Sequence, residues 1–328
     1  MNKLDPRNIY DDLHQIPELG FEEFKTSAYL ADKLEAMGYK VTRNIGGTGV
    51  IGEIKGSEPG PVMMLRADMD ALPFLIDGKK KNIHACGHDA HSAMLLAAAS
   101  ELVGKVKRGT LRILFQQGEE TLKGALAVID AGVIEDVDIA LGLHIRPVQD
   151  IAYGEMSPAV RHASSTFVNV VINGLSSHGA RPHLGVNAIE AAAVAINAIT
   201  AIKINPIIPW SCKVTGIKGG GVAPNIIPDK VEMIVDARAQ TNEAMTELLE
   251  KLRRAVTNAA AALGATAEVT TPGGVIPAAE YDDELTAEVA ECIVEVVGEE
   301  KLAKELVNPG GEDFHYFVNK YPHIKAAY

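Results

Sequence analysis

Residues 62–70 read VMMLRADMD, an apolar run that ends in two carboxylates. Residues 111–115 form a second apolar run, which is followed by a pair of glutamates, and residues 139–143 form a third, which is followed by a histidine. Short, nearly continuous apolar runs are typical of buried strands, and segments with helical spacing lie between these three. The sequence therefore predicts an α/β fold for the first half of the chain, with a sheet covered by helices on both faces.

The pattern changes after Arg161. Two expected strands alternate there with two long expected helices, which is typical of a separate α+β unit. The strands are residues 166–172 and 231–237, and the helices are residues 182–201 and 243–263. The segment TPGG at residues 271–274 marks the return to the first domain. We therefore expect a discontinuous first domain of residues 1–161 and 276–328, with an inserted domain of residues 162–275.

The composition is that of a folded, acidic protein. Of 328 residues, 47% are apolar and 23% are charged, and the three cysteines are too scattered for a disulfide framework. The net charge of −12 repels phosphate backbones and anionic membranes, so neither nucleic acid nor a membrane is an expected partner. The apolar stretch at residues 191–202 is too short for a transmembrane helix, and residues 1–6 lack a secretion signal. We expect a cytoplasmic protein.

The densest group of reactive side chains is the segment HACGHDAH at residues 84–91, just before an expected helix. A thiolate and imidazoles suit Zn²⁺ or another late divalent ion, and we expect the helix N-terminus to lower the pKa of the Cys86 thiol. The alternative is a buried structural cysteine beside solvent-facing histidines. Because three of the ten histidines of the chain fall within eight residues, we favour a metal site.

Further candidate ligands follow the three apolar runs. Asp68 and Asp70 follow the first, Glu119 and Glu120 the second, and His144 the third. In open α/β sheets, sites form outside the carboxyl ends of the strands, so we expect these side chains to converge. One glutamate would then bind metal while the other acts as general base. Taken singly, each signal has a plain alternative, namely an acidic helix start for the glutamates and a core residue for the histidine.

Three other motifs are weaker. The stretch GTGVIG at residues 47–52 matches a dinucleotide-binding fingerprint, but it does not open a helix, so we interpret its glycines as tight turns between strands. The segment SSHGARPH at residues 176–183 suits an anion site and an ordinary helix start equally well. Arg238 follows an expected strand and is either a carboxylate clamp or a solvated edge residue.

Taken together, these motifs resemble the metallo-amidohydrolases of clan MH, in the branch that contains aminoacylases, hippurate hydrolases and auxin-conjugate amidohydrolases. The resemblance covers nearly the whole chain. Its marks, in chain order, are LHQIPELG (13–20), RADMDALP (66–73), HACGHD (84–89), EE (119–120), GLH (142–144), SHG (177–179), NIIPD (225–229) and GGEDF (310–314).

The resemblance implies a fold and a cofactor. The fold is an α/β metal-binding catalytic domain, with a mixed sheet flanked by helices, that carries an inserted α+β lid and dimerisation domain. The cofactor is a pair of divalent metal ions, held by Cys86 as the bridging ligand together with His88, Glu120 and His144. Asp70 would orient a ligand histidine. We expect Zn²⁺ or Mn²⁺, with Co²⁺ or Ni²⁺ as alternatives.

The resemblance also implies catalytic roles. Glu119 would be the general base that takes a proton from the bridging water and delivers it to the leaving amine. His178 would stabilise the tetrahedral oxyanion, in this family often across a dimer interface, while Asn225 and Arg238 would hold the carboxylate of the substrate. Amide hydrolysis needs an activated water, a polarised carbonyl and a proton for the amine, and the metal pair with these groups supplies all three.

Two departures from the family pattern matter. Residues 74–82 are about ten residues shorter than the loop that the family carries there, a difference within what surface loops tolerate. The last metal ligand of the family is a histidine in a His-Pro segment after GGEDF, but this chain stops at Tyr328, and neither His315 nor His323 matches that segment. Either the sequence is incomplete at its C-terminus or one metal lacks a ligand. We favour incompleteness, because residues 324–328 resemble an interrupted strand.

We therefore expect a metal-dependent hydrolase of N-acyl amino acids or related amide conjugates, which forms a homodimer through the inserted domain. A dipeptidase or carboxypeptidase with the same site is the close alternative. A non-catalytic scaffold stabilised by metal is another, but the presence of Glu119 and His178 argues against it, because neither is needed to hold a metal. A nucleotide-dependent oxidoreductase rests only on residues 47–52.

Overall fold

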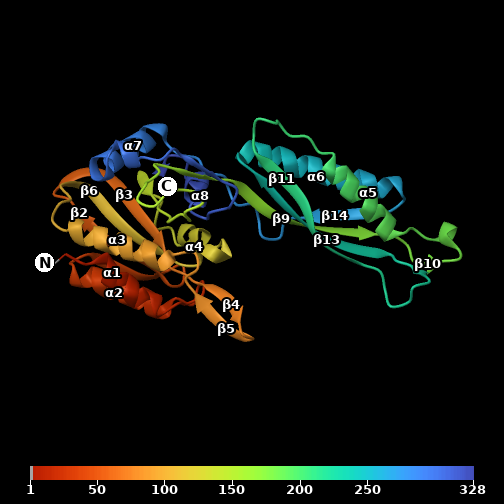
Figure 1. The fold of residues 1–328 in the computed structure, drawn as a ribbon, viewed down its shortest axis with the longest axis horizontal. Coiled ribbons are helices and arrows are strands. Elements are labelled where there is room, and N and C mark those ends of the chain that lie inside the picture. The colour runs from red at the N-terminus through yellow and green to blue at the C-terminus, as the bar shows by residue number, and fades with distance from the viewer. Residues whose placement is uncertain (1–2) are drawn as a thin grey trace. The chain divides into compact units, whose positions relative to one another are not determined.

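The computed structural model describes residues 3–328, and the packing of the chain divides it into two units. The first unit comprises Met1–Val160, Glu280–Leu306 and Glu312–Tyr328, and the second comprises Arg161–Ala279 and Val307–Gly311. Each unit has its own sheet and its own helices (Figure 1). The first unit contains two clusters of buried apolar side chains and the second contains one.

The first unit is built on a mixed sheet. Its strand order among the described residues is β1 (Lys40–Ile45), β2 (Gly49–Lys55), β6 (Arg108–Gln116), β3 (Glu58–Asp68), β7 (Ile139–Leu141) and β16 (Lys325–Ala327). β3 runs parallel to both β6 and β7, and β16 runs parallel to β7. β2 is antiparallel to both of its neighbours, β1 and β6. The predicted α/β fold with a mixed sheet is confirmed.

Helices cover both faces of this sheet. One core includes side chains of α1 (Pro6–His14), α2 (Phe24–Ala36) and α3 (His88–Leu102), and the other includes side chains of α4 (Gly124–Asp130) and α8 (His315–Lys320). α7 (Asp283–Val297) contacts β16. Ile113 and Phe115 of β6 belong to the first core, whereas Leu114 between them belongs to the second. Successive side chains of a strand point to opposite faces, so one central strand supports both layers.

The second unit is a sheet covered on one face by two helices (Figure 1). Its antiparallel strands, in order, are β11 (Trp210–Gly219), β13 (Lys230–Ala239), β9 (Ser164–Asn173) and β14 (Thr266–Thr270). Its helices are α5 (Ala188–Thr200) and α6 (Asn242–Ala262). Val168 and Val170 of β9 are buried with Leu248 of α6, whereas Phe167 on the opposite face is 57% exposed. This is the α+β architecture that the sequence predicts.

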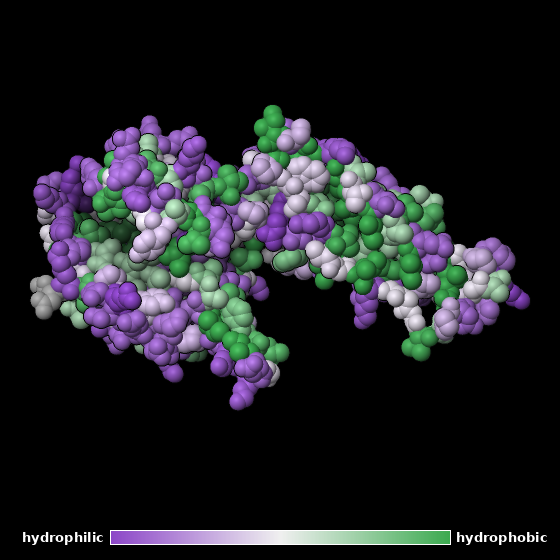
Figure 2. All heavy atoms as spheres, viewed as in Figure 1, coloured by the Kyte–Doolittle hydropathy of each residue, from purple (hydrophilic) through white to green (hydrophobic). Residues whose placement is uncertain are grey.

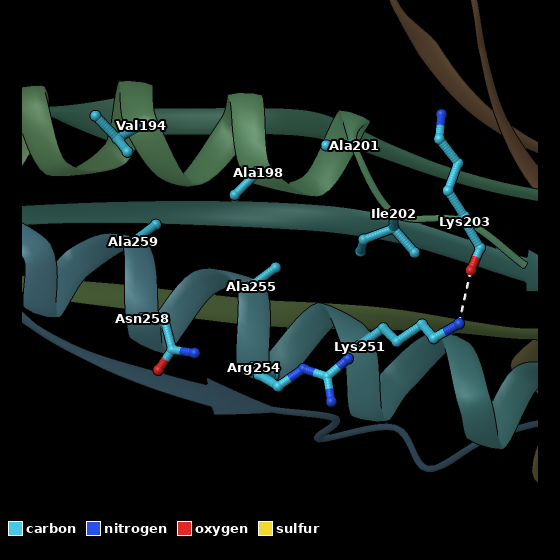
Figure 3. Close-up of a pocket in the computed structure, with 10 residues that line it drawn as sticks. All are labelled: Val194, Ala198, Ala201, Ile202, Lys203, Lys251, Arg254, Ala255, Asn258 and Ala259. Atoms are coloured by element: carbon cyan, nitrogen blue, oxygen red, sulfur yellow. Dashed lines mark hydrogen bonds between the residues drawn. The ribbon is translucent and has the colours of Figure 1, made fainter.

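A groove of about 560 Å³ lies between α5 and α6 (Figure 3). Ala198 of α5 and Ala255 of α6 line it, and such small side chains let two helices lie close together. At one end, Nζ of Lys251 donates a hydrogen bond of 2.7 Å to the carbonyl oxygen of Lys203 (Figure 3). The groove belongs to the second unit, whereas the predicted metal ligands belong to the first.

Short elements complete the described chain. The strands β4 (Leu72–Ile76) and β5 (Lys79–Ile83) form a hairpin that exposes Phe74 and Leu75, in a region where Figure 2 shows apolar atoms. The other short elements are β8 (Val160–His162), β10 (Ser177–His178), β12 (Ile226–Ile227), β15 (Leu306–Asn308) and the 3₁₀ turns Glu119–Thr121, Pro182–Leu184 and Glu299–Lys301. No helix within residues 3–328 combines the length and the apolar character that a membrane span requires.

Two expected element boundaries are wrong. The helix expected over residues 182–201 begins only at Ala188, because the chain first makes a 3₁₀ turn, and the side chain of Asn187 then caps α5 by accepting from the N–H of Ile189. The strand expected from the apolar run at residues 62–70 begins four residues earlier, because residues 58–61 already belong to β3, at the exposed end of that strand.

The glycines at residues 47–52 serve the β1–β2 hairpin, as predicted. Gly46 and Gly47 have positive φ values of 57° and 126°, which only glycine adopts without strain, and Gly49 begins β2. Residues 325–327 form the strand β16, which pairs with β7.

We predict that Leu248→Ala lowers the free energy of unfolding by about 2–5 kcal/mol, because it removes fully buried methyl groups and leaves a cavity. Leu263→Ala, just after α6, is the matched control. That side chain is 42% exposed, so the loss should stay below about 1 kcal/mol. Urea unfolding followed by circular dichroism measures both values. Equal losses in the two variants would contradict this description of the second core.

Candidate metal centre

The parallel strands of the first unit place their carboxyl ends at one edge of the sheet. β3 ends at Asp68 and β6 ends at Gln116, and these two residues are partners in the register. β7 ends at Leu141, three residues before His144. The polar segments that follow the strands therefore meet at this edge, which is where open α/β sheets form their sites.

Five of the predicted site residues come together at this edge. Cys86, His88 and His144 present ligand atoms that all lie within 4.8 Å of one another, and so do His88, Glu119 and Glu120. His88 belongs to both groups, so the two groups are adjacent. The Sγ atom of Cys86 is 3.3 Å from Nε2 of His144. The site therefore brings together soft sulfur, imidazole nitrogen and carboxylate oxygen. This set of donor atoms suits late divalent ions.

The loop before α3 owes its shape to Gly87. This residue has a φ of 91°, a conformation that side chains with a Cβ rarely adopt. A Cβ built there would also lie 2.3 Å from Cδ1 of Ile145, in the segment that carries His144. Glycine thus lets the Cys86 loop and the His144 segment pack directly against each other, and α3 begins with His88 immediately afterwards.

Unpartnered polar atoms at this edge show that the site fits a metal ion. Nε2 of His88 and Oε1 of Glu120 are buried, and among the described residues neither has a hydrogen-bond partner. The two atoms are 3.9 Å apart. Buried polar atoms in proteins nearly always have a partner, so a pair that faces each other across a gap is the arrangement expected around a cation.

Asp70 holds two of these residues in place. Its Oδ1 lies 2.9 Å from Nδ1 of His88, and its Oδ2 accepts a hydrogen bond of 3.0 Å from the N–H of Glu120. Because Nδ1 of His88 is engaged, Nε2 is the atom left to bind a ligand. A carboxylate behind an imidazole is the usual support of a metal-binding histidine. This is the position that the family resemblance implies for Asp70.

Burial and neighbouring charge shift the ionisation of these groups. Burial lowers the pKa of the His144 imidazole to about 4. For His88, burial acts in the same direction, but the Asp68 and Asp70 carboxylates outweigh it and raise the pKa well above the ordinary value. The expected lowering of the Cys86 pKa is wrong. Burial raises it, because the desolvation of a thiolate exceeds what nearby positive charge returns.

Glu119 lies deeper than Glu120. Its carboxylate is within 4.8 Å of those of Glu312 and Asp313, and the three are buried. Burial is the main cause that raises the pKa of Glu119 well above its ordinary value, and the charges of Glu312 and Asp313 add to it. A carboxyl group with a raised pKa both accepts and returns a proton near neutral pH.

The other predicted site residues belong to the second unit. His178 in β10 pairs with Ile226 in β12, and the N–H of Gly179 donates a 2.7 Å hydrogen bond to the carbonyl oxygen of Asn225. The structure thus brings His178 and Asn225 into one small ribbon. Arg238 bonds Asp236 at 2.9 Å and the carbonyl oxygen of Pro309 at 2.8 Å. That these residues act together with the metal ligands of the first unit stays a prediction.

Comparison with known proteins identifies the family. A model of the peptidase family M20/M25/M40 matches residues 64–327. The chain belongs to this family. It is therefore a metal-dependent hydrolase of amide bonds, and the predicted relationship to hippurate hydrolases and N-acyl amino acid hydrolases is confirmed.

Several relatives of this M20 protein resemble it over most of its length. It is 34% identical to thermostable carboxypeptidase 1 of Saccharolobus solfataricus, over 94% of this chain and 82% of the relative. It is 33% identical to the hippurate hydrolase of Campylobacter jejuni, over 94% and 84%. A dinuclear metal binding M20 peptidase of Bacillus subtilis has a solved structure that matches with a TM-score of 0.79 and 30% identity, over 98% of this chain and 86% of that one.

Sequence reasoning missed the buried partners behind the ligands. Arg66 is fully buried and bonds Asp68 and Asp313 at 2.8 Å each, and it lies 3.0 Å from Glu312. The signal was present, because an arginine inside an apolar strand must find carboxylates when that strand is central. The sequence did not show which ones, since Asp313 lies 247 residues away along the chain.

We predict that Cys86→Ser lowers the metal content of this M20 protein while leaving its fold intact, because a hydroxyl replaces a much better ligand of nearly the same size. Cys212→Ser in β11 is the matched control, since that half-buried thiol lies in the second unit. Elemental analysis after dialysis against Zn²⁺, together with circular dichroism, tests both variants. Equal metal content in both would contradict the assignment of Cys86 as a ligand.

We also predict a pH effect on the metal-free protein. The pKa of His144 is about 4 in the folded state and near 6.5 in the unfolded state, so between these values only the unfolded chain binds the proton. His144 therefore contributes a decrease in the unfolding free energy as the pH falls from 6.5 to 4. His144→Gln should flatten this slope, whereas His323→Gln, at an exposed position, should not. Urea unfolding across this range measures the slopes, and an unchanged slope in His144→Gln would contradict the prediction.

Proposed function

We propose that this M20 protein hydrolyses the amide bond of N-acyl amino acids or closely related conjugates, releasing a carboxylic acid and an amino acid. The observation that carries the proposal is the placement of Glu119, a buried carboxylate beside the metal-ligand groups that shares His88 and Glu120 as neighbours. Relatives that are a hippurate hydrolase and an N-acetyl-L-cysteine deacetylase, each 33% identical, support this substrate class.

We propose that two divalent ions bind at this edge, Zn²⁺ or Mn²⁺ before Co²⁺ or Ni²⁺. Cys86, His88, His144 and Glu120 would hold them, with Cys86 as the ligand that both ions share, as the family resemblance implies. The dinuclear site of the Bacillus subtilis M20 peptidase supports the number. When bound, such ions polarise a carbonyl and lower the pKa of water, which is the chemistry that amide hydrolysis lacks at neutral pH.

In this proposal Glu119 is the general base and then the general acid. Its carboxylate accepts the proton of the attacking water and passes it to the nitrogen of the leaving amine. The enclosed position supports this role, because a buried carboxyl with a raised pKa keeps a proton that an exposed glutamate would lose to solvent. Glu120 has the different task of binding metal, since its Oε1 faces Nε2 of His88.

We propose that the second unit supplies the remaining contacts to the substrate. His178 would stabilise the oxyanion of the tetrahedral intermediate, and Asn225 and Arg238 would hold the carboxylate of the amino acid. The β10–β12 ribbon supports a shared task for His178 and Asn225, because it holds their backbones together. The guanidinium of Arg238 is anchored on Asp236 and on the Pro309 carbonyl, which fixes its orientation.

We further propose a cytoplasmic homodimer that forms through the second unit. Exposed apolar side chains on that unit support this assembly, and they include Ile189 and Val194 of α5 and Ile217 of β11. The partner of the site itself is a small molecule.

A carboxypeptidase or dipeptidase activity is the second candidate. The specific observation in its favour is the 34% identity to a thermostable carboxypeptidase. The same metal ligands and the same base serve both reactions. The two activities differ only in the group that the substrate carries on the acyl side of the amide bond. Hydrolysis rates on N-acetyl and N-benzoyl amino acids and on dipeptides, before and after Zn²⁺ or Mn²⁺ is added back, decide between the two. A protein that binds metal and hydrolyses none of these would be a scaffold.

We predict that Glu119→Gln lowers kcat by about 10²–10⁴-fold and leaves the metal content unchanged, because the amide keeps the shape of the side chain but accepts no proton. Glu120→Gln is the matched variant one residue away. It should lose metal as well as activity, since it removes a ligand. Steady-state kinetics and elemental analysis on the same preparations test the pair. Full activity in Glu119→Gln would overturn the proposed base, and metal loss in both variants would overturn the division of roles.

A further inference from the structure

We propose that Asp68 and His91 form a buried tether that positions His144 for metal binding, without binding metal themselves. The proposal rests on the metal centre proposed above and adds positioning residues to it. Both side chains are fully buried.

Both ring nitrogens of His91 are engaged. Nδ1 lies 2.6 Å from Oδ1 of Asp68, and Nε2 accepts a hydrogen bond of 2.9 Å from the N–H of Ile145. An N–H donor at Nε2 requires a lone pair there, so the proton of the neutral ring is on Nδ1 and points at the carboxylate. Asp68, His88 and His91 lie close enough to hold an ion, but no lone pair of His91 is left for one.

The tether connects the segment that carries Cys86 and His88 to the segment that carries His144. His91 lies on α3, three residues after His88 and five after Cys86, and Ile145 directly follows His144. Residues 142–147 form neither helix nor strand, so regular structure does not fix the third ligand. The hydrogen bond from the Ile145 N–H therefore links the His144 segment to the same helix that begins with His88.

Ring packing strengthens the link. The rings of His91 and His144 meet edge to face, with centroids 4.4 Å apart and an angle of 64° between their planes. Nε2 of the same His144 ring lies 3.3 Å from Sγ of Cys86. A ligand displaced by a few tenths of an ångström binds metal less tightly, because coordination distances vary little.

Asp68 is able to fix the ring because its own charge is balanced elsewhere. Its Oδ2 bonds Nη1 of Arg66 at 2.8 Å, and its Oδ1 is left for His91. A carboxylate in this position accepts only, so it keeps the proton of His91 on Nδ1 and leaves Nε2 as the acceptor. The partner carboxylate thus determines which tautomer meets the Ile145 N–H.

The neighbouring residue Ser92 provides a matched control. Its Oγ donates a hydrogen bond of 2.8 Å to the carbonyl oxygen of Asp68, so it also fastens α3 to the end of β3. It is as buried as His91, but it makes no contact with the His144 segment through that bond. If the role of His91 were merely structural, substitution of either residue would weaken metal binding equally. The tether predicts that only substitution of His91 weakens it.

The experiment titrates the metal-free full chain with Co²⁺ and follows the absorption of the thiolate–Co²⁺ pair. We expect His91→Asn to weaken Co²⁺ binding about 10–100-fold, because its amide reaches Asp68 but not Ile145. His91→Gln should recover most of the affinity, because its longer side chain brings an amide oxygen to the position of Nε2. Ser92→Ala should bind Co²⁺ as the wild type does, although it unfolds at lower urea concentration.

The outcomes separate the tether from the metal centre. Wild-type affinity in His91→Asn overturns the tether while the centre stands, and so does a loss in Ser92→Ala equal to that in His91→Asn. Equal weakening in His91→Asn and His91→Gln overturns the role of Nε2 as the essential acceptor. Absence of Co²⁺ binding by the wild type overturns the metal centre itself. Circular dichroism of each variant confirms that the proteins compared are folded.

Discussion

Arg66 is fully buried, and its guanidinium faces three carboxylates at the carboxyl end of the central strand β3. A buried charge without partners is very costly, so this side chain and its partners fold together or not at all. Removal of one partner of such a group typically costs about 3–5 kcal/mol. The network joins the end of β3, at Asp68, to Glu312 and Asp313 of the GGEDF segment. The segment that follows Asp68 carries Asp70, which supports two of the candidate ligands.

From this network, a series of side chains leads outward to the candidate metal centre. Asp68 shares one oxygen with Arg66 and offers the other to His91. Asp70, two residues further, supports His88 and the backbone of Glu120. Asp68 is the last residue of β3, whereas Asp70 lies in the irregular segment that follows the strand, and the two carboxylates serve two different parts of the site. One short stretch of chain therefore orients ligands that come from three loops.

The electrostatic state of the site follows from the same burial. Carboxylates and imidazoles crowd this edge, and burial raises the pKa of Glu119 and lowers that of His144. Groups so close together compete for protons, and a divalent cation relieves that competition by favouring the ionised carboxylates and the neutral imidazoles. The shifts therefore reflect an arrangement that is suited to an ion as well as to protons.

The sequence by itself determined the fold class, the family and the identity of the ligand types. The strand with the acidic end, the HACGHDAH segment and the paired glutamates are local patterns, and local patterns carry periodicity and donor chemistry without any knowledge of the fold. The parallel direction of β3, β6 and β7 agrees with that alternation of strands and helices, because parallel neighbours need a crossover, whereas their order in the sheet comes from the structure.

Only the tertiary structure decided which side chains meet. His91 belongs to the same segment as His88, and the sequence gives no reason to separate a ligand from a tether, since both are histidines before or on one helix. The difference lies in Ile145, 54 residues further along the chain, whose N–H occupies the nitrogen of His91 that would otherwise bind metal. The burial of Cys86, which reverses the expected direction of its pKa shift, likewise depends on segments remote in sequence. Such contacts depend on packing between distant parts of the chain, which composition and spacing do not encode.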